Sequence, residues 1–471
     1  MPRSTQAMID GTTPNGTLLA LDLRAIGRGR RSAVLTEHLR DAIRSRTLAA
    51  GTSLPASRAL AADLGVSRGV VVRAYEQLAA EGFLEARHGS GTTVAEVPAP
   101  DGRGSVAIEH RPSNPGLPSG ADFPRAAWSR AAHRGLARLT DAELGYGDPA
   151  GLARLREELA AHLGRVRAVL APPQQVVVTN GFAQASRLVA DVLLARGIGR
   201  VGVEDPGSPG LREQLASTGL ECVPIPVDAE GIDSAALAAS RVRAVFVTPA
   251  HQFPTGIVMS ARRRHALLDW ARGVGGLLVE DDYDAELRYD RAPVGALQGL
   301  GPDVVLHGGS VSKTLAPGIR LGWLVVPDHM VREVTDAKYA ADLCRGVIDQ
   351  ATVAELLASG ELDRHRRRSA AEHRRRRDRL VAALGRSFPD WTVSGAAAGL
   401  HLVVQLAGEE DEEAVAAAAQ SIGIDARPLR GYAVHAPTPR ALVVGYGHQR
   451  ADQLERAVAG LARSLGRVSP E

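Results

Sequence analysis

The segment from which the rest of this sequence can be interpreted reads Ser310-Val311-Ser312-Lys313-Thr314-Leu315-Ala316-Pro317-Gly318-Ile319-Arg320. Lys313 is one of two lysines in 471 residues, and the other 54 of the 56 Lys+Arg residues are arginines. A guanidinium is a poor nucleophile, whereas a buried ε-amine can lose its proton and condense with a carbonyl. The two nearby hydroxyls and the guanidinium suit an aldehyde that carries a phosphate. We therefore expect a Schiff-base lysine at 313 and an ordinary solvated lysine at Lys338.

The bulk composition limits the class of protein. A chain of 471 residues argues for two or three domains, and 45% hydrophobic with 23% charged residues is ordinary for a globular protein. Cys222 and Cys344 lie far apart and predict neither a disulfide framework nor a metal site. We find no leader-like start and no apolar run of membrane-spanning length, so we expect a cytoplasmic protein that does not contact the membrane.

The positive charge is concentrated near the N-terminus. Residues 1–97 hold 12 Arg against nine Asp+Glu, whereas residues 98–471 hold 44 basic and 44 acidic side chains. The whole formal charge of +3 therefore belongs to the first part of the chain. An acidic polymer such as DNA is the partner that this distribution favours.

The periodicity of apolar residues divides the chain into segments. Residues 1–30 are expected to form a tail. Helical spacing follows from Ser32 to about Leu48, from Ser57, as a capping residue, to Leu64, and from Ser67 to Gly82, and residues 83–95 are typical of a hairpin. Three helices closed by a hairpin predict a winged helix-turn-helix over residues 31–97.

Residues 98–111 are rich in Pro and Gly and predict a linker. The region 112–465 then alternates helical patterns with short apolar strands, which favours an α/β fold with a mostly parallel sheet. The strands are expected at 176–179, 201–204, 242–248, 276–280, 304–308 and 321–326. From about residue 345, a long basic helix and a smaller α+β unit are expected.

The first region resembles the DNA-binding domain of GntR-type regulators, in the motifs Leu54-Pro55-Ala56-Ser57-Arg58, Leu64-Gly65-Val66-Ser67-Arg68 and Arg87-His88-Gly89-Ser90-Gly91. The start of the third helix is expected to enter the major groove, with Arg68 reading guanine and with Ser67 and Arg58 holding phosphate. Val70 departs from the family, where threonine is frequent. The resemblance implies double-stranded DNA contacts at Arg58, Ser67, Arg68, Gly69, Val70, His88 and Gly89.

The second region resembles fold-type-I aminotransferases, which bind pyridoxal 5′-phosphate. The matching motifs are Thr179-Asn180-Gly181-Phe182-Ala183-Gln184, Thr248-Pro249-Ala250-His251-Gln252-Phe253-Pro254-Thr255-Gly256, Glu280-Asp281-Asp282-Tyr283 and the Lys313 segment. The resemblance implies that Lys313 forms the imine, Asp281 holds the pyridine nitrogen and Tyr283 reaches the ring hydroxyl. The phosphate is expected at the helix start formed by Gly181, Phe182 and Ala183, together with Ser310, Ser312 and Arg320.

A winged helix joined to such a domain is the domain organisation of the MocR/PdxR subgroup of GntR regulators. The motif His251-Gln252-Phe253-Pro254-Thr255-Gly256 also resembles that subgroup. The resemblance implies a domain-swapped homodimer and a transcription factor that senses pyridoxal phosphate, with or without an amine or amino acid. The alternatives are a catalytic aminotransferase with a DNA-binding appendage and a regulator that has lost the cofactor.

Two positions depart from the aminotransferase pattern. Ser208 stands where an aromatic ring near the cofactor is usual, and Phe182 is a candidate to cover the gap. Val443 stands where many transaminases place the arginine that grips a substrate carboxylate, which disfavours efficient turnover. Substitutes for that arginine are Arg440, Arg427 and Arg430, which the sequence does not rank. The basic run 364–379 is expected to be a solvated helix at a dimer rim, with a second nucleic-acid site as the alternative.

Overall fold

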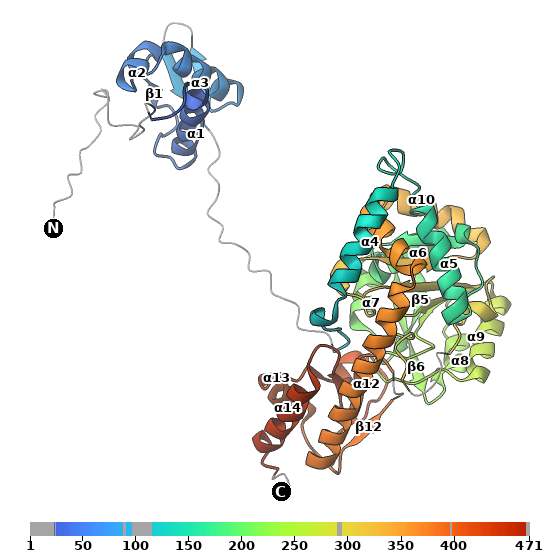
Figure 1. Cartoon of the computed structure of the whole chain (residues 1–471). Coiled ribbons are helices and arrows are strands. Elements are labelled where there is room, and N and C mark those ends of the chain that lie inside the picture. The colour runs from blue at the N-terminus through green and yellow to red at the C-terminus, as the bar shows by residue number, and fades with distance from the viewer. Residues whose placement is uncertain are drawn as a thin grey trace. The chain divides into compact units, whose positions relative to one another are not determined.

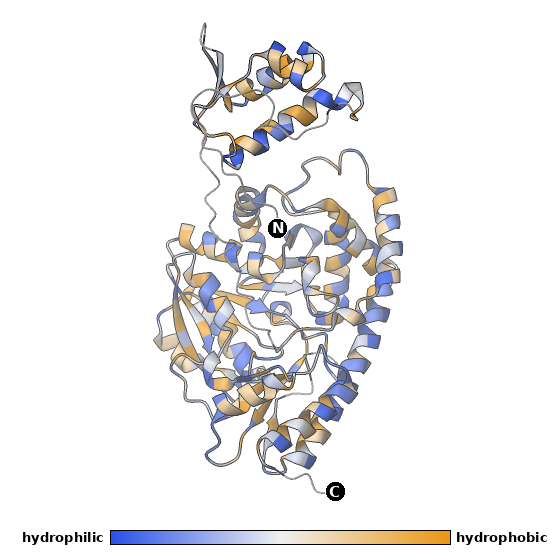
Figure 2. Ribbon diagram, turned by 90° about the vertical axis from the view of Figure 1, so that its left-hand side faces the viewer, coloured by the Kyte–Doolittle hydropathy of each residue, from blue (hydrophilic) through white to orange (hydrophobic). Residues whose placement is uncertain are grey.

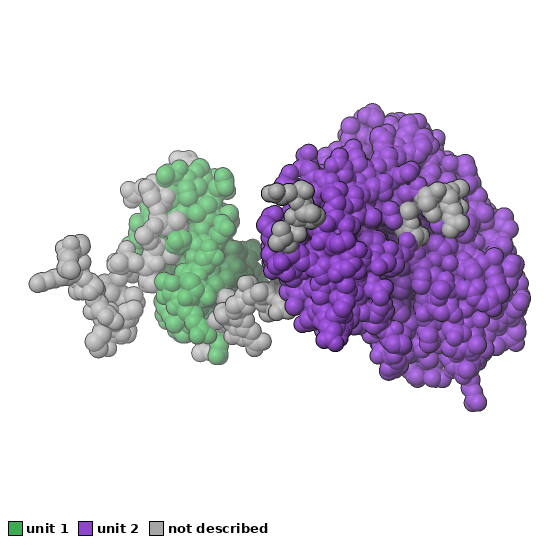
Figure 3. All heavy atoms as spheres, turned by 90° about the horizontal axis from the view of Figure 1, so that it is seen from below, with its two compact units in different colours: residues 1–110 green, residues 111–471 purple. Residues whose placement is uncertain are grey.

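The computed structural model describes residues 23, 25–87, 91–96, 115–289, 294–395 and 398–467. The chain divides into two compact units, Met1–His110 and Arg111–Glu471 (Figures 1 and 3). The division falls inside the predicted linker, all of which lies outside the described residues, as does most of the predicted N-terminal tail.

The first unit contains helices α1 (Arg31–Arg44), α2 (Ser57–Asp63) and α3 (Arg68–Ala80). Strands β1 (Ser53–Leu54), β3 (Gly91–Val94) and β2 (Leu84–Arg87) form its sheet, in that order. The helices bury one apolar face each, as at Leu35, Leu39 and Val71. The predicted winged helix-turn-helix is confirmed, except that Ala56 rather than Ser57 is the N-cap of α2.

The second unit is built on a sheet with the strand order β4-β11-β10-β9-β8-β5-β6-β7. Pairing is parallel from β10 through β9, β8 and β5 to β6, whereas β11 and β7 run antiparallel to their neighbours. The strands are β4 (Val176–Thr179), β5 (Arg200–Asp205), β6 (Glu221–Asp228), β7 (Gly231–Ile232), β8 (Ala244–Val247), β9 (Leu277–Asp281), β10 (Val305–Ser310) and β11 (Gly322–Val325).

The predicted mostly parallel sheet is confirmed, and the expected strands are present with ends that differ by at most two residues. Strand β6 was missed by the sequence analysis. Pro224 and Pro226 interrupt its apolar run, and proline ordinarily argues against a strand.

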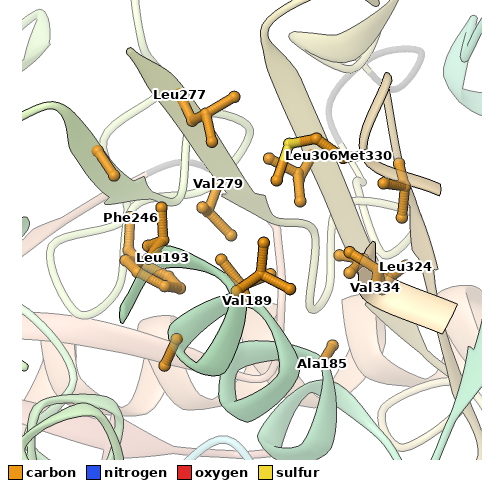
Figure 4. Close-up of a cluster of buried hydrophobic side chains, with 14 of the residues drawn as sticks. Ala185, Val189, Leu193, Phe246, Leu277, Val279, Leu306, Leu324, Met330 and Val334 are labelled. Atoms are coloured by element: carbon orange, nitrogen blue, oxygen red, sulfur yellow. The ribbon is translucent and has the colours of Figure 1, made fainter. Parts of the chain in front are cut away.

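Helices cover both faces of this sheet because successive strand residues point to opposite sides. Val279 packs in a cluster with Val189 and Leu193 of α6 (Phe182–Ala195), as Figure 4 shows. Its neighbour Leu278 packs instead with Leu267 of α9 (Ala261–Val274). The other helices are α4 (Arg125–Arg138), α5 (Ala153–Arg167), α7 (Pro209–Ala216), α8 (Ser234–Ala239), α10 (Val331–Asp342) and α11 (Val347–Ala358). Apolar and polar residues are interspersed along these helices (Figure 2).

The long basic helix is α12 (Glu361–Ser387), and the expected α+β unit follows it. An antiparallel sheet runs in the order β12 (Thr392–Ser394), β13 (His401–Gln405), β15 (Ala441–Gly445) and β14 (Ala426–Pro428), accompanied by α13 (Glu412–Ser421) and α14 (Ala451–Ser464). One face of α12 is buried, including His373 and Leu380, while Arg367 and Arg374 are exposed. Within the described part of the chain, no helix has the length and apolar character needed to cross a bilayer.

The prediction that Lys338 is a solvated lysine is wrong. Lys338 lies in α10 with no exposed surface, and its Nζ is 2.5 Å from Oδ1 of Asp342, one helical turn later. The ion pair compensates the buried charge, which explains how this lysine can lie inside the fold.

Candidate functional site

A cavity of about 160 Å³ lies at the carboxyl ends of strands β5, β8 and β9. In a parallel sheet this edge is where ligands bind. Three predicted residues, Lys313, Asp281 and Tyr283, line the cavity together. The remaining lining residues are Gly116, Val203, Glu204, Gly207, Ser208, Leu211, Arg212, Phe246, Val247, Thr248 and Phe253.

Lys313 follows strand β10 in a turn, and its side chain is half-buried. The Nζ donates a hydrogen bond of 2.6 Å to the carbonyl of Gly116. Burial lowers the pKa of Lys313, although the nearby Asp284 and Asp281 carboxyls oppose that shift. A lowered pKa increases the fraction of neutral amine, which is the nucleophilic form.

Asp281 is the last residue of β9 and faces the same cavity. Burial raises its pKa well above the ordinary range, and the neighbouring carboxyls of Asp282 and Asp284 act in the same direction. Its Oδ1 is buried and has no hydrogen-bond partner among the described residues. A buried polar atom of this kind calls for a partner that the described chain does not supply.

Tyr283 is held by a buried polar group that sequence reasoning did not single out. Its hydroxyl lies 3.1 Å from Nδ1 of His251, which lies 2.9 Å from Oδ2 of Asp284. Burial raises the pKa of Tyr283 well above the ordinary range. Gly399, with φ of +70°, passes so close that a Cβ there would lie 2.3 Å from Asp284 Oδ2. The sequence motif that contains His251 could have indicated this group. Its partners Tyr283 and Asp284, however, lie 32 and 33 residues further along the chain.

The predicted phosphate residues lie around the start of α6 and the turn after β10. Gly181 has φ of +82°, and a Cβ at that position would lie 3.1 Å from a terminal nitrogen of Arg320. The Arg320 guanidinium donates 2.6 Å to the carbonyl of Asn180, and Ser310 Oγ accepts 3.3 Å from the Ser312 amide. These residues, like Phe182 and Ala183, lie outside the cavity lining, and their phosphate role stays a prediction.

Buried ion pairs and hydrogen bonds fix the end of strand β9, next to Asp281. The Arg167 guanidinium, fully buried, donates to both carboxylate oxygens of Asp282 at 2.7 and 3.1 Å. His307 Nδ1 lies 3.2 Å from Glu280 Oε2. Burial lowers the pKa of His307, but the Glu280 and Asp282 carboxylates together outweigh burial and the net shift is upward. These paired charges hold the end of β9 in place.

Ser208 does not replace the missing aromatic ring. It is the N-cap of α7, and its Oγ accepts 3.3 Å from the amide of Leu211. The ring of Phe182 packs against Gly308, where a Cβ would lie 2.5 Å from it, and Phe182 is not among the residues that line the cavity. The cavity therefore extends into the space beside Ser208.

Two ionisable lining residues, Glu204 and Arg212, were not predicted as site residues. Glu204 Oε2 accepts 2.5 Å from Thr248 and 3.1 Å from Gln252, while Oε1 is buried without a partner among the described residues. Burial raises the pKa of Glu204 to about 7. Arg212 lies four residues after Ser208 on α7. The signal that could have pointed to them is the Asp205-Pro206-Gly207-Ser208 segment, which lies between them in the sequence.

Val443 is fully buried in an apolar cluster with Tyr432 and Phe253. Of the suggested substitutes, Arg430 pairs with Glu412 and Glu413, and Arg440 donates to the carbonyl of Gly408. None of the three suggested arginines, Arg427 included, lines the cavity.

The predicted DNA contacts mostly lie on the surface of the first unit. Arg58, Ser67, Arg68 and Gly69 are exposed, and Arg68 Nε donates 3.3 Å to Ser57 Oγ. The prediction for Val70 is wrong, because its side chain is 5% exposed and packs in the core of that unit. The apolar face of α3 includes this position, so the side chain is unavailable to DNA. His88 and Gly89 lie outside the described residues.

Comparison with known proteins assigns both regions to families. Residues 32–94 match the bacterial regulatory proteins of the gntR family, and residues 115–461 match aminotransferase class I and II. The chain is thus a GntR-type protein with an aminotransferase-class domain. Kynurenine aminotransferase from Pyrococcus horikoshii has a similar fold, with a TM-score of 0.67 and 26% identity over 74% of this chain and 89% of that one.

Two relatives share the whole layout. The pyridoxine biosynthesis transcriptional regulator PdxR of Corynebacterium glutamicum is 34% identical, over 92% of this chain and 96% of its own length. The probable rhizopine catabolism regulatory protein MocR of Rhizobium meliloti is also 34% identical, over 88% of this chain and 89% of its own length. The chain belongs to the MocR/PdxR subgroup of GntR-type transcriptional regulators.

Proposed function

We propose that this regulator binds pyridoxal 5′-phosphate through Lys313 and senses that cofactor, alone or with an amine or amino acid, by a change in its affinity for operator DNA. One observation carries the proposal. The half-buried amine of Lys313, with its lowered pKa, lines the same cavity as a buried carboxyl oxygen of Asp281 that has no hydrogen-bond partner among the described residues. The pair fits an aldehyde attached to a ring with a basic nitrogen.

Each residue then has a defined task. Asp281 would accept a hydrogen bond from the ring nitrogen, and Tyr283, oriented by His251, would contact the ring hydroxyl. The phosphate would lie at the backbone amides of Gly181, Phe182 and Ala183, with Ser310, Ser312 and Arg320 around it. When bound, the cofactor supplies an aldehyde that condenses with amines.

The first unit would carry the operator contact. Arg58, Ser67, Arg68 and Gly69 are exposed at and near the start of α3, the end of such a helix that enters the major groove. Double-stranded DNA is therefore the proposed partner. Cofactor or effector binding in the second unit would shift the DNA affinity as a coupling free energy between two sites.

We propose no net catalysis. The position at which many transaminases carry the arginine that grips the substrate carboxylate is the buried Val443, so that family's carboxylate contact is not at its usual place. The regulator function is also the one in the names of the relatives.

A second copy of the chain is the other proposed partner. Large apolar side chains are exposed around α4, α10 and α11: Leu136, Tyr146, Tyr339, Leu343 and Ile348 are 44 to 87% exposed. Tyr146 lines a further cavity together with residues 344–347, so part of this surface is continuous. Apolar surface of this kind favours a homodimer, in line with the domain-swapped dimer that the resemblance implies. Sedimentation velocity tests this expectation.

The cofactor test uses the fact that the chain has two lysines. Protein loaded with pyridoxal phosphate is expected to absorb in the visible range, and borohydride reduction followed by peptide mass spectrometry should place the adduct on Lys313. Lys313→Arg, which keeps the charge, should abolish the absorbance, whereas Lys338→Met should retain it. An adduct on Lys338 alone, or an unchanged spectrum for Lys313→Arg, contradicts the proposal.

A further inference from the structure

Arg212 is a cation in the cavity without a carboxylate partner among the residues that the structure describes. Its Nη1 donates 3.0 Å to the carbonyl of Gly207 and 3.0 Å to that of Tyr432. It forms no ion pair with a carboxylate among the described residues. Asp205, whose charge acts on Arg212, is already occupied, since its two oxygens accept the amides of Val434, His435 and Ala436 at 2.7 to 2.8 Å.

Partial burial makes this arrangement costly for a guanidinium. Burial lowers the pKa of Arg212, an effect that the charges of Asp205, Cys222 and Glu213 oppose without outweighing it. Two neutral carbonyls compensate the charge less well than an anion does, and the bonds to these carbonyls use a single nitrogen. Nε and Nη2 form no hydrogen bond with the described residues, and they are the pair of donors that matches a carboxylate.

The surroundings of Arg212 leave room for a ligand. Ser208, one turn earlier on α7, is small where the family has a ring, and Val203, Leu211 and Phe246 form apolar walls. Glu204 is an independent indication that a polar group of a ligand belongs in the cavity. Its side chain is almost fully buried, and Oε1 has no partner among the described residues.

We propose that Arg212 binds the carboxylate of the effector, so that the regulator recognises an amino acid rather than a simple amine. This inference rests on the proposed function, because the amine of the same molecule would have to reach the cofactor aldehyde near Lys313. The carboxylate would then be bound by a residue of α7, and not at position 443 in β15, where many transaminases have an arginine. The hydrocarbon between amine and carboxylate would contact the apolar walls of the cavity.

The test uses matched pairs of ligands with full-length, cofactor-loaded protein. Straight-chain α- and ω-amino carboxylates of two to six carbons are titrated beside alkylamines of the same length, and binding is followed by the visible absorbance and by calorimetry. Wild-type protein is expected to prefer the best amino carboxylate over its matched alkylamine by at least about tenfold, as a charge-assisted hydrogen-bond pair allows. Arg212→Met should remove this preference and leave the alkylamine affinity unchanged.

Control variants separate charge from packing. Arg430→Met and Arg440→Met change exposed arginines outside the cavity lining and should keep the preference. If Arg212→Met does not fold, Arg212→Lys should keep part of the preference and Arg212→Gln should lose it. A preference that survives Arg212→Met, that Lys and Gln variants lose equally, or that wild type lacks overturns the inference. A wild-type protein without the visible band instead defeats the proposed function itself.

Discussion

The buried carboxyl of Glu204 makes the stability of the second unit depend on pH in a calculable way. Glu204 is 6% exposed, and burial raises its pKa from 4.5 to about 7. The two values differ by about 2.5, which at about 1.4 kcal/mol for each pH unit amounts to about 3 kcal/mol. Glu204→Gln keeps the size of the side chain and removes this ionisation.

The direction follows from the raised pKa. Below pH 4.5 both states hold the proton and Glu204 causes no loss of stability. As pH rises towards 7, the unfolded chain ionises while the folded protein keeps the proton, so the unfolded state gains. Above pH 7 the loss is complete. The free energy of unfolding of Glu204→Gln minus that of wild type should therefore grow by about 3 kcal/mol between pH 4.5 and 8.

Urea unfolding of the cofactor-free protein measures this difference. All four tryptophans, at positions 128, 270, 323 and 391, belong to the second unit, so their fluorescence reports the unit that contains Glu204. A pH-independent effect of the new amide would appear only as a constant offset. Glu221→Gln, at an exposed glutamate, is the control and should give a flat difference. A flat difference for Glu204→Gln as well would refute the reasoning.

Three further outcomes are expected. Arg68→Ala should weaken operator binding by about 1–3 kcal/mol and relax specificity at one base pair, measured by fluorescence anisotropy against an operator library; equal affinity and specificity would rule out groove insertion. Arg167→Met removes the guanidinium partner of the buried Asp282 and should cost the second unit about 3–5 kcal/mol in urea unfolding. Arg187→Met removes an exposed ion pair with Asp191 and should cost less than about 1 kcal/mol; similar losses would contradict the assigned burial. Gly151→Ala should lower the melting temperature measurably more than Gly147→Ala, because a Cβ at 151 would lie 2.6 Å from Val178 and nothing lies near one at 147.

Much of the fold followed from local patterns. The three helices of the first unit and the strands around the site have runs whose period and end signals are visible within about ten residues, so their existence was predictable. The apolar spacing of the third helix already indicated that Val70 lies on its buried face. We nevertheless predicted a DNA contact there from the family resemblance, and the side chain is buried. Lys338 was misjudged for a related reason, because nothing in the local run indicated a fully buried charge beside Asp342.

The sequence by itself determined which chemical groups this protein carries. The rare amine of Lys313, the carboxyl of Asp281 and the basic helix-turn-helix near the N-terminus were recognised from residue types and their spacing. Only the tertiary structure decided which groups share the cavity and which charges lack partners. Arg212 and Glu204 come from different elements than Lys313. Hydrogen-bond partners of their charged groups, Tyr432 for Arg212 and Thr248 for Glu204, are distant in sequence. Burial and pairing are properties of the folded packing, and no local pattern contains them.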